Sequence, residues 1–538
     1  MRRMTPSSIC AKLSLPSKGL TMHSSRRSFL KTAAASASLA ALPRAGRSAA
    51  RFLTADALQA KLAADPLRPQ FHLLPAKNWM NDPNGPIFWN GLYHIFFQYN
   101  PNAAVWGDMH WNHAVSEDMI HWRHQPIALA PTPGWADADG CFTGSAVNDN
   151  GTATILYTGV QEAPFERATL RDGHHNFRET QCLATSSDPQ LRTWNKWKDP
   201  VIQPPDDPKL TGFRDPFLWR DESAKVWYLG VASGQFKVGG RVLLYRSKDL
   251  RNWEYLHPLA AGHWTEKENT NPVDSGEMWE CPDFFPLGKK HVLLYSTAGQ
   301  VVWEVGELDS KELVFHPQKR GVLDHGAYYA QKTQLDAHGN RILWGWIPEK
   351  RPDSELIAAG WAGCMALPRV LSLGPDDTLE MNFPQQVKSL QRAPASLKTG
   401  YLIAPDAPNV RIEGIKLENL AFELAWISAR HPWSFTLSDS AGAWLSVGFS
   451  LFESGARMKM NDVTFDISHT DPKWRRFRMI VDGSVVETIC NQREALTLRV
   501  YRNPKGPLTL TTHVPENSDF MWGEAWQLNS ISKDRLTT

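Results

Sequence analysis

The sequence predicts an all-β protein: a five-bladed β-propeller followed by a C-terminal β-sandwich. The first observation behind this prediction is a repeat, in which an acidic residue, a short apolar strand, a tight polar turn and a second apolar strand occur five times before residue 347. The second is a change of pattern in the last part of the chain, where short strands alternate apolar and polar residues. Repeated hairpins at intervals of roughly 40 to 80 residues are typical of radial repetition, and the propeller is its commonest closed form.

The first repeat begins in the sequence WMNDPNG at residues 79–85, which places Asp82 in a turn directly before an apolar hairpin. Taken alone, this motif is explained equally well as a turn, because Asn, Pro and Gly each fit turn dihedrals. Recurrence favours more than a turn, since acidic residues lead the later repeats in the same phase. We expect these acidic residues to ring one mouth of a central channel. The later repeats begin at Asp139-Gly140, Arg214-Asp215-Pro216, Glu280-Cys281-Pro282-Asp283 and Asp324-His325-Gly326.

A second repeated motif supports the prediction of blades. The sequence SEDMIHW at residues 116–122 recurs as SKDLRNW at residues 247–253, and more loosely at residues 187–194. Because blades are copies of one unit, residues at equal phase should occupy equivalent positions around the axis.

The first fifty residues predict an export signal. They hold nine Lys or Arg and no Asp or Glu, and the pair Arg26 and Arg27 precedes a weakly apolar stretch at residues 33–42. This order of charged, apolar and small residues resembles a twin-arginine signal, and a disordered basic tail is the alternative. We expect residues 1–50 to be removed and the mature protein to be periplasmic or secreted.

Charge and hydropathy argue against two classes of protein. Without the leader, 49 Lys and Arg face 56 Asp and Glu, so the formal charge moves from +2 to about −7 and gives no support for a nucleic-acid partner. No segment has the roughly 20 apolar residues that span a bilayer, so we expect no membrane contact after signal removal. The remaining cysteines are odd in number and lack zinc-ligand spacing, and they are Cys141, Cys182, Cys281, Cys364 and Cys490.

The length after the leader exceeds what one core usually supports and predicts two domains. We assign residues 51–380 to the propeller, 381–397 to a linker and 398–538 to the β-sandwich. The linker contains Pro384 and Pro394, with room for one helical turn at residues 385–390. In the last segment Asp482-Gly483 is a strong hairpin signal, and several short strands at this spacing are typical of a sandwich.

Three acidic residues are candidates for chemistry, because Asp82, Asp215 and Glu280 each come just before a Pro or Cys-Pro and a bulky apolar strand. Their surroundings are rich in tryptophan, whose faces stack on sugar rings, although much of this tryptophan belongs to the core. Paired carboxylates in an aromatic funnel are what the cleavage of a glycosidic bond requires.

Three blocks carry a family resemblance: WMNDPNG at residues 79–85, FRDP at residues 213–216 and WECPD at residues 279–283. In this order and spacing they resemble the signature blocks of glycoside hydrolase family 32, which includes invertases, inulinases, levanases and fructan exohydrolases. The sequence VDGSVVE at residues 481–487 also matches. The resemblance covers the chain from about residue 71 and implies the fold predicted above.

The resemblance further implies a retaining mechanism at C2 of a β-D-fructofuranosyl unit in sucrose, fructo-oligosaccharides or fructan. Asp82 would be the nucleophile and Glu280 the acid and base. Asp215 would bind fructose hydroxyls and stabilise the oxocarbenium-like transition state, with Arg214 keeping it ionised. No cofactor or metal is implied. The family's sugar pocket maps onto Asn81, Gln98, Trp106, Phe142, Thr143, Arg214 and Asp324.

One departure bears on the substrate. Many plant-type relatives that cleave sucrose have Asp-x-x-Lys where this chain has Asp324-His325-Gly326-Ala327, so the resemblance does not separate sucrose from inulin or levan. Two alternatives remain open at this point: a fructosyltransferase that uses the same three acids, and a non-catalytic propeller that binds fructan.

Overall fold

The computed structural model describes residues 55–392, 415–428, 432–452, 455–467, 475–513 and 521–532. The predicted leader at residues 1–50 lies outside these residues, as does the part of the expected linker beyond residue 392. Among the described residues, no helix has the length and apolar character needed to cross a membrane.

Helices are short and lie at the ends of the propeller segment. A helix that the sequence analysis did not anticipate, α2 (Ala55–Ala64), precedes the first blade. α3 (Asp353–Ala359) ends at Gly360, which adopts a left-handed φ of 82° and donates its N–H to the carbonyl of Leu356, as helix C-caps commonly do. The helical turn expected at residues 385–390 is confirmed as the 3-10 helix η1 (Gln385–Leu390).

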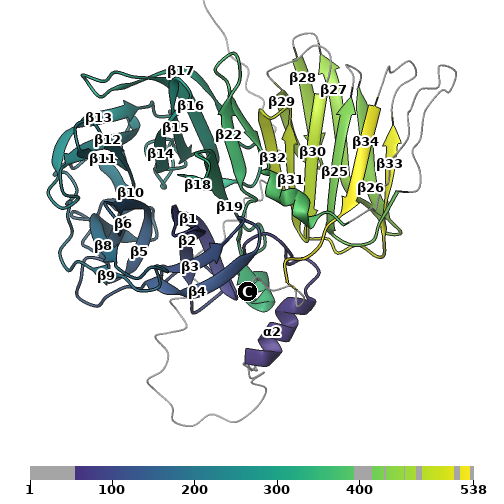
Figure 1. Cartoon of the computed structure of the whole chain (residues 1–538), viewed down its shortest axis with the longest axis horizontal. Helices are drawn as coiled ribbons and strands as arrows, with labels where there is room; N and C mark the ends of the chain where they lie inside the picture. The colour runs from purple at the N-terminus through teal and green to yellow at the C-terminus, as the bar shows by residue number, and fades with distance from the viewer. Residues whose placement is uncertain are drawn as a thin grey trace, which may run out of the picture. The chain divides into compact units, whose positions relative to one another are not determined.

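The first two blades are built on the antiparallel hairpins expected from the sequence (Figure 1). In the first blade the strand order is β20-β1-β2-β3-β4, and β20 pairs parallel with the start of β1. Its strands are β1 (Asn78–Trp89), β2 (Leu92–Asn100), β3 (His110–Ser116), β4 (Trp122–Leu129) and β20 (Trp361–Ala362). The second blade contains β5 (Gly140–Asp149), β6 (Thr152–Glu162), β7 (Leu170–Arg171), β8 (Asn176–Ser186) and β9 (Asn195–Lys196).

The third and fourth blades are four-stranded meanders, in which each strand pairs with the next along the chain. The third contains β10 (Leu210–Asp221), β11 (Val226–Gln235), β12 (Gly239–Ser247) and β13 (Glu254–Ala261). The fourth contains β14 (Glu280–Leu287), β15 (Lys290–Thr297), β16 (Gln300–Leu308) and β17 (Phe315–Val322). The fifth blade contains β18 (Tyr329–Leu335), β19 (Arg341–Ile347), β21 (Cys364–Met365), β22 (Arg369–Leu373) and β23 (Leu379–Asn382).

The five blades close into a ring. Their inner strands contact one another in the order β1, β5, β10, β14 and β18, and β18 returns to β1. The parallel pairing of β20 with β1 joins the end of the fifth repeat to the first blade. A closed ring leaves no exposed inner edge, and it brings equivalent residues of the five repeats around one axis.

The repeated motif at residues 116–122 and 247–253 forms the turn between the third and fourth strands of a blade. In the first blade the carboxylate of Asp118 accepts the backbone N–H groups of Ile120 and His121. In the third blade Asp249 accepts those of Arg251 and Asn252 in the same way. These side chains satisfy backbone donors where the ladder is interrupted, which explains why the pattern recurs.

The C-terminal domain is a sandwich of two antiparallel sheets. One sheet has the order β24-β33-β26-β27-β28-β29 and the other the order β32-β31-β30-β25-β34. Residues of both sheets, such as Phe435 and Met479, pack in one apolar core. The predicted fold class is therefore confirmed. The strands are β24 (Ile415–Leu417), β25 (Ala421–Ser428), β26 (Trp433–Asp439), β27 (Gly442–Phe452), β28 (Gly455–Met460), β29 (Val463–Ile467), β30 (Arg475–Asp482), β31 (Val485–Cys490), β32 (Glu494–Arg499), β33 (Leu508–His513) and β34 (Met521–Gln527).

A buried polar network ties the segment before the first blade to the sandwich. The imidazole of His72 lies between two carboxylates, 2.8 Å from Asp482 Oδ2 and 2.9 Å from Glu487 Oε1. Arg369 of the fifth blade donates to the other Glu487 oxygen at 2.9 Å. Burial alone would lower the pKa of His72, but the hydrogen bonds and charges of the two carboxylates outweigh it and raise the pKa to about 9.

Candidate active site

Each inner strand has an irregularity in its pairing with the second strand of the same blade, near the end where the strand begins. These β-bulges re-aim side chains and are common beside active sites. At three of them the first extra residue has a left-handed backbone, with φ of 60° at Asp215, 48° at Cys281 and 56° at Ala330. The shifts lie between Met80 and Pro83, Phe142 and Gly144, Arg214 and Phe217, Glu280 and Asp283, and Tyr329 and Lys332.

The bulges gather Asp82 and its hydrogen-bond donors from the first, second and fourth blades. Thr143 Oγ1 of the second blade donates to Asp82 Oδ2 at 2.7 Å, and Asn81 Nδ2 donates to Oδ1 at 3.0 Å. The thiol of Cys281, from the fourth blade, lies 3.4 Å from Oδ2. Trp79 Nε1 in turn donates to Asn81 Oδ1 at 2.7 Å. Asp82 is partly exposed, so its carboxylate is oriented and still open to a ligand.

Glu280 begins β14 and is held at both oxygens. Arg214 Nη2 donates to Glu280 Oε1 at 2.8 Å, and the Tyr329 hydroxyl donates to Oε2 at 2.8 Å. The Glu280 side chain is 24% exposed, whereas the Arg214 side chain is 6% exposed. Glu280 is therefore oriented at both oxygens and is still partly open to solvent.

Asp215 is the buried member of the three carboxylates. Its Oδ2 accepts the backbone N–H of Cys281 at 2.9 Å and lies 3.6 Å from the Cys281 thiol, and its own N–H donates to Thr158 Oγ1 at 2.9 Å. Cys281 thus contacts Asp215 and Asp82 through its sulfur and directly follows Glu280 in the chain. These contacts bring all three predicted acids into one cluster.

The electrostatics of the site follow from burial and from the shared negative charge. Burial raises the pKa of Asp215 to about 7, the charges of Glu280 and Asp82 add to the rise, and Arg214 opposes it without outweighing it. Arg214 therefore does not keep Asp215 fully ionised at neutral pH, contrary to the expectation from the sequence. Burial also raises the pKa of Asp82. The hydrogen bond from Thr143 lowers this pKa, and the negative charge of Glu280 raises it further.

Aromatic and amide side chains surround this cluster on the first two blades. Trp106 and Phe142 pack edge to face, with ring centroids 6.0 Å apart. Gln98 Nε2 donates to the carbonyl of Cys141 at 3.0 Å and to Thr143 Oγ1 at 3.4 Å, so it supports the donor of Asp82. Of the residues expected in the sugar pocket, Asn81, Thr143 and Arg214 contact the carboxylates directly.

Asp324 does not join this cluster. Its side chain is fully buried, and it accepts from Arg369 at 2.8 Å and from Thr497 Oγ1 at 2.7 Å. It belongs to the network between the fifth blade and the sandwich. The repeat phase explains the difference, because the fifth blade places Tyr329, and not Asp324, next to its bulge.

Three side chains that hold the site had no predicted role in it. Tyr329 occupies the same phase as Glu280, immediately before the bulge, and aligning the bulges instead of the acidic residues would have found it. Cys281 was noted only among the cysteines that lack zinc-ligand spacing, although its thiol contacts Asp82 and Asp215. Glu179 lies in β8, a strand that none of the acidic motifs precedes, so no sequence signal indicated its contact with Arg214 at 2.9 Å.

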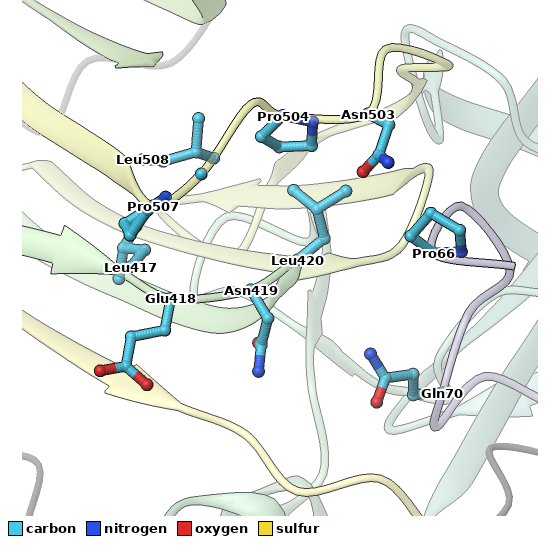
Figure 2. A pocket seen from close by; sticks show the side chains of 11 residues that line it. Pro66, Gln70, Leu417, Glu418, Asn419, Leu420, Asn503, Pro504, Pro507 and Leu508 are labelled. Carbon is cyan, nitrogen blue, oxygen red and sulfur yellow. The ribbon is translucent and has the colours of Figure 1, made fainter. Parts of the chain in front are cut away.

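Other candidate sites do not compete with this one. Within the described part of the chain, no group of three or more His, Cys, Asp and Glu side chains is arranged to hold a metal ion. Figure 2 shows a pocket in which Glu418 is the one carboxylate and none of the predicted site residues takes part. That pocket is lined by Pro66, Gln70, Leu417, Glu418, Asn419, Leu420, Asn503, Pro504, Gly506, Pro507 and Leu508.

Known proteins resemble this chain in sequence and in fold. The model of the glycosyl hydrolases family 32 N-terminal domain matches residues 72–384. Sucrose-6-phosphate hydrolase of Escherichia coli is 33% identical over 477 residues, which cover 81% of this chain and 90% of that protein. Raffinose invertase of Escherichia coli is 32% identical over 464 residues, covering 80% and 89%. A family 32 β-fructofuranosidase of Bombyx mori superposes with a TM-score of 0.72 at 28% identity, covering 88% of this chain and 96% of its own.

A match over more than half of the chain, together with relatives aligned over most of both lengths, establishes the family. The chain belongs to glycoside hydrolase family 32, and it is a glycosidase of the β-fructofuranosidase type.

Proposed function

We propose that this enzyme hydrolyses terminal β-D-fructofuranosyl units from sucrose, fructo-oligosaccharides or fructan with retention at C2, and that Asp82, Glu280 and Asp215 carry the reaction. The observation that supports this most is the convergence of two partly exposed carboxyl groups from blades that are not neighbours in the ring. Asp82 and Glu280 lie at one mouth, linked by the Cys281 thiol that contacts Asp82 and follows Glu280. A retaining glycosidase needs such a pair, one to attack and one to protonate.

In the first step an Asp82 oxygen attacks C2 of the fructosyl unit, and Glu280 gives its proton to the departing glycosidic oxygen. The C2–O bond to the leaving group breaks as the fructosyl ester of Asp82 forms. In the second step Glu280 takes a proton from water, the hydroxyl attacks C2 and Asp82 leaves as a carboxylate. The donors on Asp82, Thr143 and Asn81, hold one face of the nucleophile toward the substrate.

Asp215 has a different task because it is buried beside both reacting carboxylates. Positive charge develops on the fructosyl ring in the transition state, and an ionised Asp215 stabilises it through space. Its protonated form would instead donate to a fructose hydroxyl. Trp106 and Phe142 offer aromatic surface to the sugar on the side of the first two blades.

The relatives support the choice of substrates. Their names describe the hydrolysis of sucrose-6-phosphate and raffinose, and one solved relative at 28% identity is in complex with sucrose. Incubation with sucrose, 1-kestose, inulin and levan, followed by separation of products by size, tests the proposal. Free fructose as the first product from at least one of these substrates supports it. Products longer than the donor at high sucrose concentration would favour the fructosyltransferase instead.

Export of the enzyme is part of the proposal. The basic leader with Arg26 and Arg27 supports a twin-arginine route. Replacing both residues by lysine should leave the enzyme in the cytoplasm of a bacterial host that has this pathway, and fractionation measures it. Unchanged appearance of activity outside the cytoplasm would contradict the proposed route.

A further inference from the structure

A carboxylate that the mechanism does not use lies behind Arg214. Glu179, in β8 of the second blade, has no exposed surface. Its Oε1 accepts from Arg214 Nη1 at 2.9 Å, and its Oε2 accepts the backbone N–H of Phe213 at 2.7 Å and the hydroxyl of Thr169 at 2.8 Å. Glu179 therefore binds the guanidinium of Arg214 and also the backbone of Phe213, the residue directly before Arg214 in β10.

The guanidinium passes this orientation on to Glu280. Its Nη1 is engaged by Glu179, while its Nη2 donates to Glu280 Oε1 at 2.8 Å. The planar fork of an arginine fixes the direction of one nitrogen once the other is held. Loss of the Glu179 contact would free the guanidinium to rotate away from Glu280.

Charge gives Glu179 a second effect. Arg214 carries one positive charge and lies near three carboxylates, Glu179 at 2.9 Å, Glu280 at 2.8 Å and Asp215 at 3.9 Å. If the charge of Glu179 were removed, more of the positive charge of Arg214 would act on Glu280 and favour its ionised form. A general acid has to hold a proton, and this change would make Glu280 a poorer one.

The other charged and titratable groups around Glu280 and Arg214 come from three further inner strands and from β14 itself. They are Asp82 of β1, Asp215 of β10, Cys281 of β14, and Tyr329 and Lys332 of β18. Of these groups Asp215 lies near Arg214 Nε at 3.9 Å, whereas Glu179 is bound at Nη1.

We propose that Glu179 is a positioning residue for catalysis, which aims Arg214 at Glu280 and balances its charge so that Glu280 can act as the acid. This inference rests on the proposed role of Glu280. Glu179 lies in a strand without an acidic motif. Its loss should impair proton donation by Glu280 more than nucleophilic attack by Asp82.

The test is Glu179→Gln, which keeps the shape of the side chain and removes its charge. For sucrose, whose leaving group needs protonation, kcat/KM should fall roughly ten- to a hundredfold, and the alkaline limb of its pH profile should move to lower pH by about one unit. An aryl β-D-fructofuranoside, whose leaving group departs with little help, should lose about threefold or less. Thr169→Ser keeps both the charge and the hydroxyl and is the matched control.

Equal losses for both substrates with an unmoved alkaline limb would show that Glu179 only supports the fold, and would overturn the inference. If Glu179→Gln does not fold, Glu179→Asp gives the answer, because its shorter carboxylate weakens the contact with Arg214. Its limb should then move part of the way in the same direction, and an unmoved limb with equal losses again overturns the inference. Full activity of Glu280→Gln on sucrose would instead overturn the proposed function itself.

Discussion

Asp215→Asn should make the folded protein more stable while it removes most of the activity. Asp215 is 3% exposed, and burial raises its pKa from 3.8 to about 7. A carboxyl group with a raised pKa binds its proton more tightly in the folded state than in the unfolded state. Its ionisation therefore costs stability, and the cost begins above the unfolded pKa and is complete above the folded pKa.

The size of the effect follows from the shift of the pKa. A shift of about three units corresponds to about 4 kcal/mol of unfolding free energy at full ionisation. Between pH 5 and pH 8 the wild-type protein should lose about 2 to 3 kcal/mol from this group, and the amide of the variant should lose none. The amide oxygen of the variant side chain can still accept the N–H of Cys281, so the hydrogen bond that Asp215 makes there is kept.

Thermal or urea unfolding of both proteins between pH 5 and pH 8 measures this. The difference in stability should favour the variant and should grow as the pH rises. Asp462→Asn, which removes a charge from an exposed turn, should show no such growth. A variant that is less stable than wild type at pH 8 would mean that Arg214 dominates and that Asp215 is ionised throughout, which refutes the reasoning.

Three further predictions concern two buried histidines, His72 and His94, and the aromatic side chain of Trp106. The pKa of His72 is raised to about 9, so the stability that the protonated imidazole contributes is complete below pH 6.5. About 3 kcal/mol of unfolding free energy should be lost as the pH rises to 9. The unfolding free energy of His72→Gln should lack this dependence on pH, and an identical dependence would contradict the prediction. Burial lowers the pKa of His94 to about 4, so the stability that the neutral imidazole contributes is present above pH 6.5 and should be lost between pH 6.5 and 4. His94→Gln should therefore resist acid unfolding better, relative to its own stability at pH 7. Equal midpoints of acid unfolding for the two proteins would count against this prediction. Trp106→Ala should raise KM for sucrose about tenfold with a smaller change in kcat, measured by steady-state kinetics, and an unchanged KM would remove Trp106 from the sugar site.

The sequence was sufficient for the propeller because its hairpins recur along the chain. It was also sufficient to bring Asp82, Asp215 and Glu280 together, since each lies near the start of an inner strand. Their exact phase differs, because Glu280 precedes its bulge, Asp215 is the first residue within its own and Asp82 the second. The outer strands were harder to predict. β13 and β17, for example, have one buried residue each and lack the runs of buried residues that mark inner strands.

The errors have a common physical origin. Asp324 was assigned to the pocket from the family resemblance, but in the fifth blade the bulge follows Tyr329, and Asp324 pairs with Arg369 instead. Glu179 and Arg214 are 35 positions apart on different blades, so only the folded ring shows their contact. Local pattern predicts which strands form, whereas contacts between blades depend on how the ring closes.

The most direct test of the account is to trap the fructosyl enzyme. Glu280→Gln should react with an aryl β-D-fructofuranoside, whose leaving group needs little protonation, and should then release fructose slowly because water lacks its base. After an acid quench and digestion, mass spectrometry should find one anhydrofructose unit on the peptide that contains Asp82. The same label on a peptide without Asp82, or turnover of sucrose by this variant at the wild-type rate, would contradict the central claim that these two carboxyl groups act as nucleophile and acid.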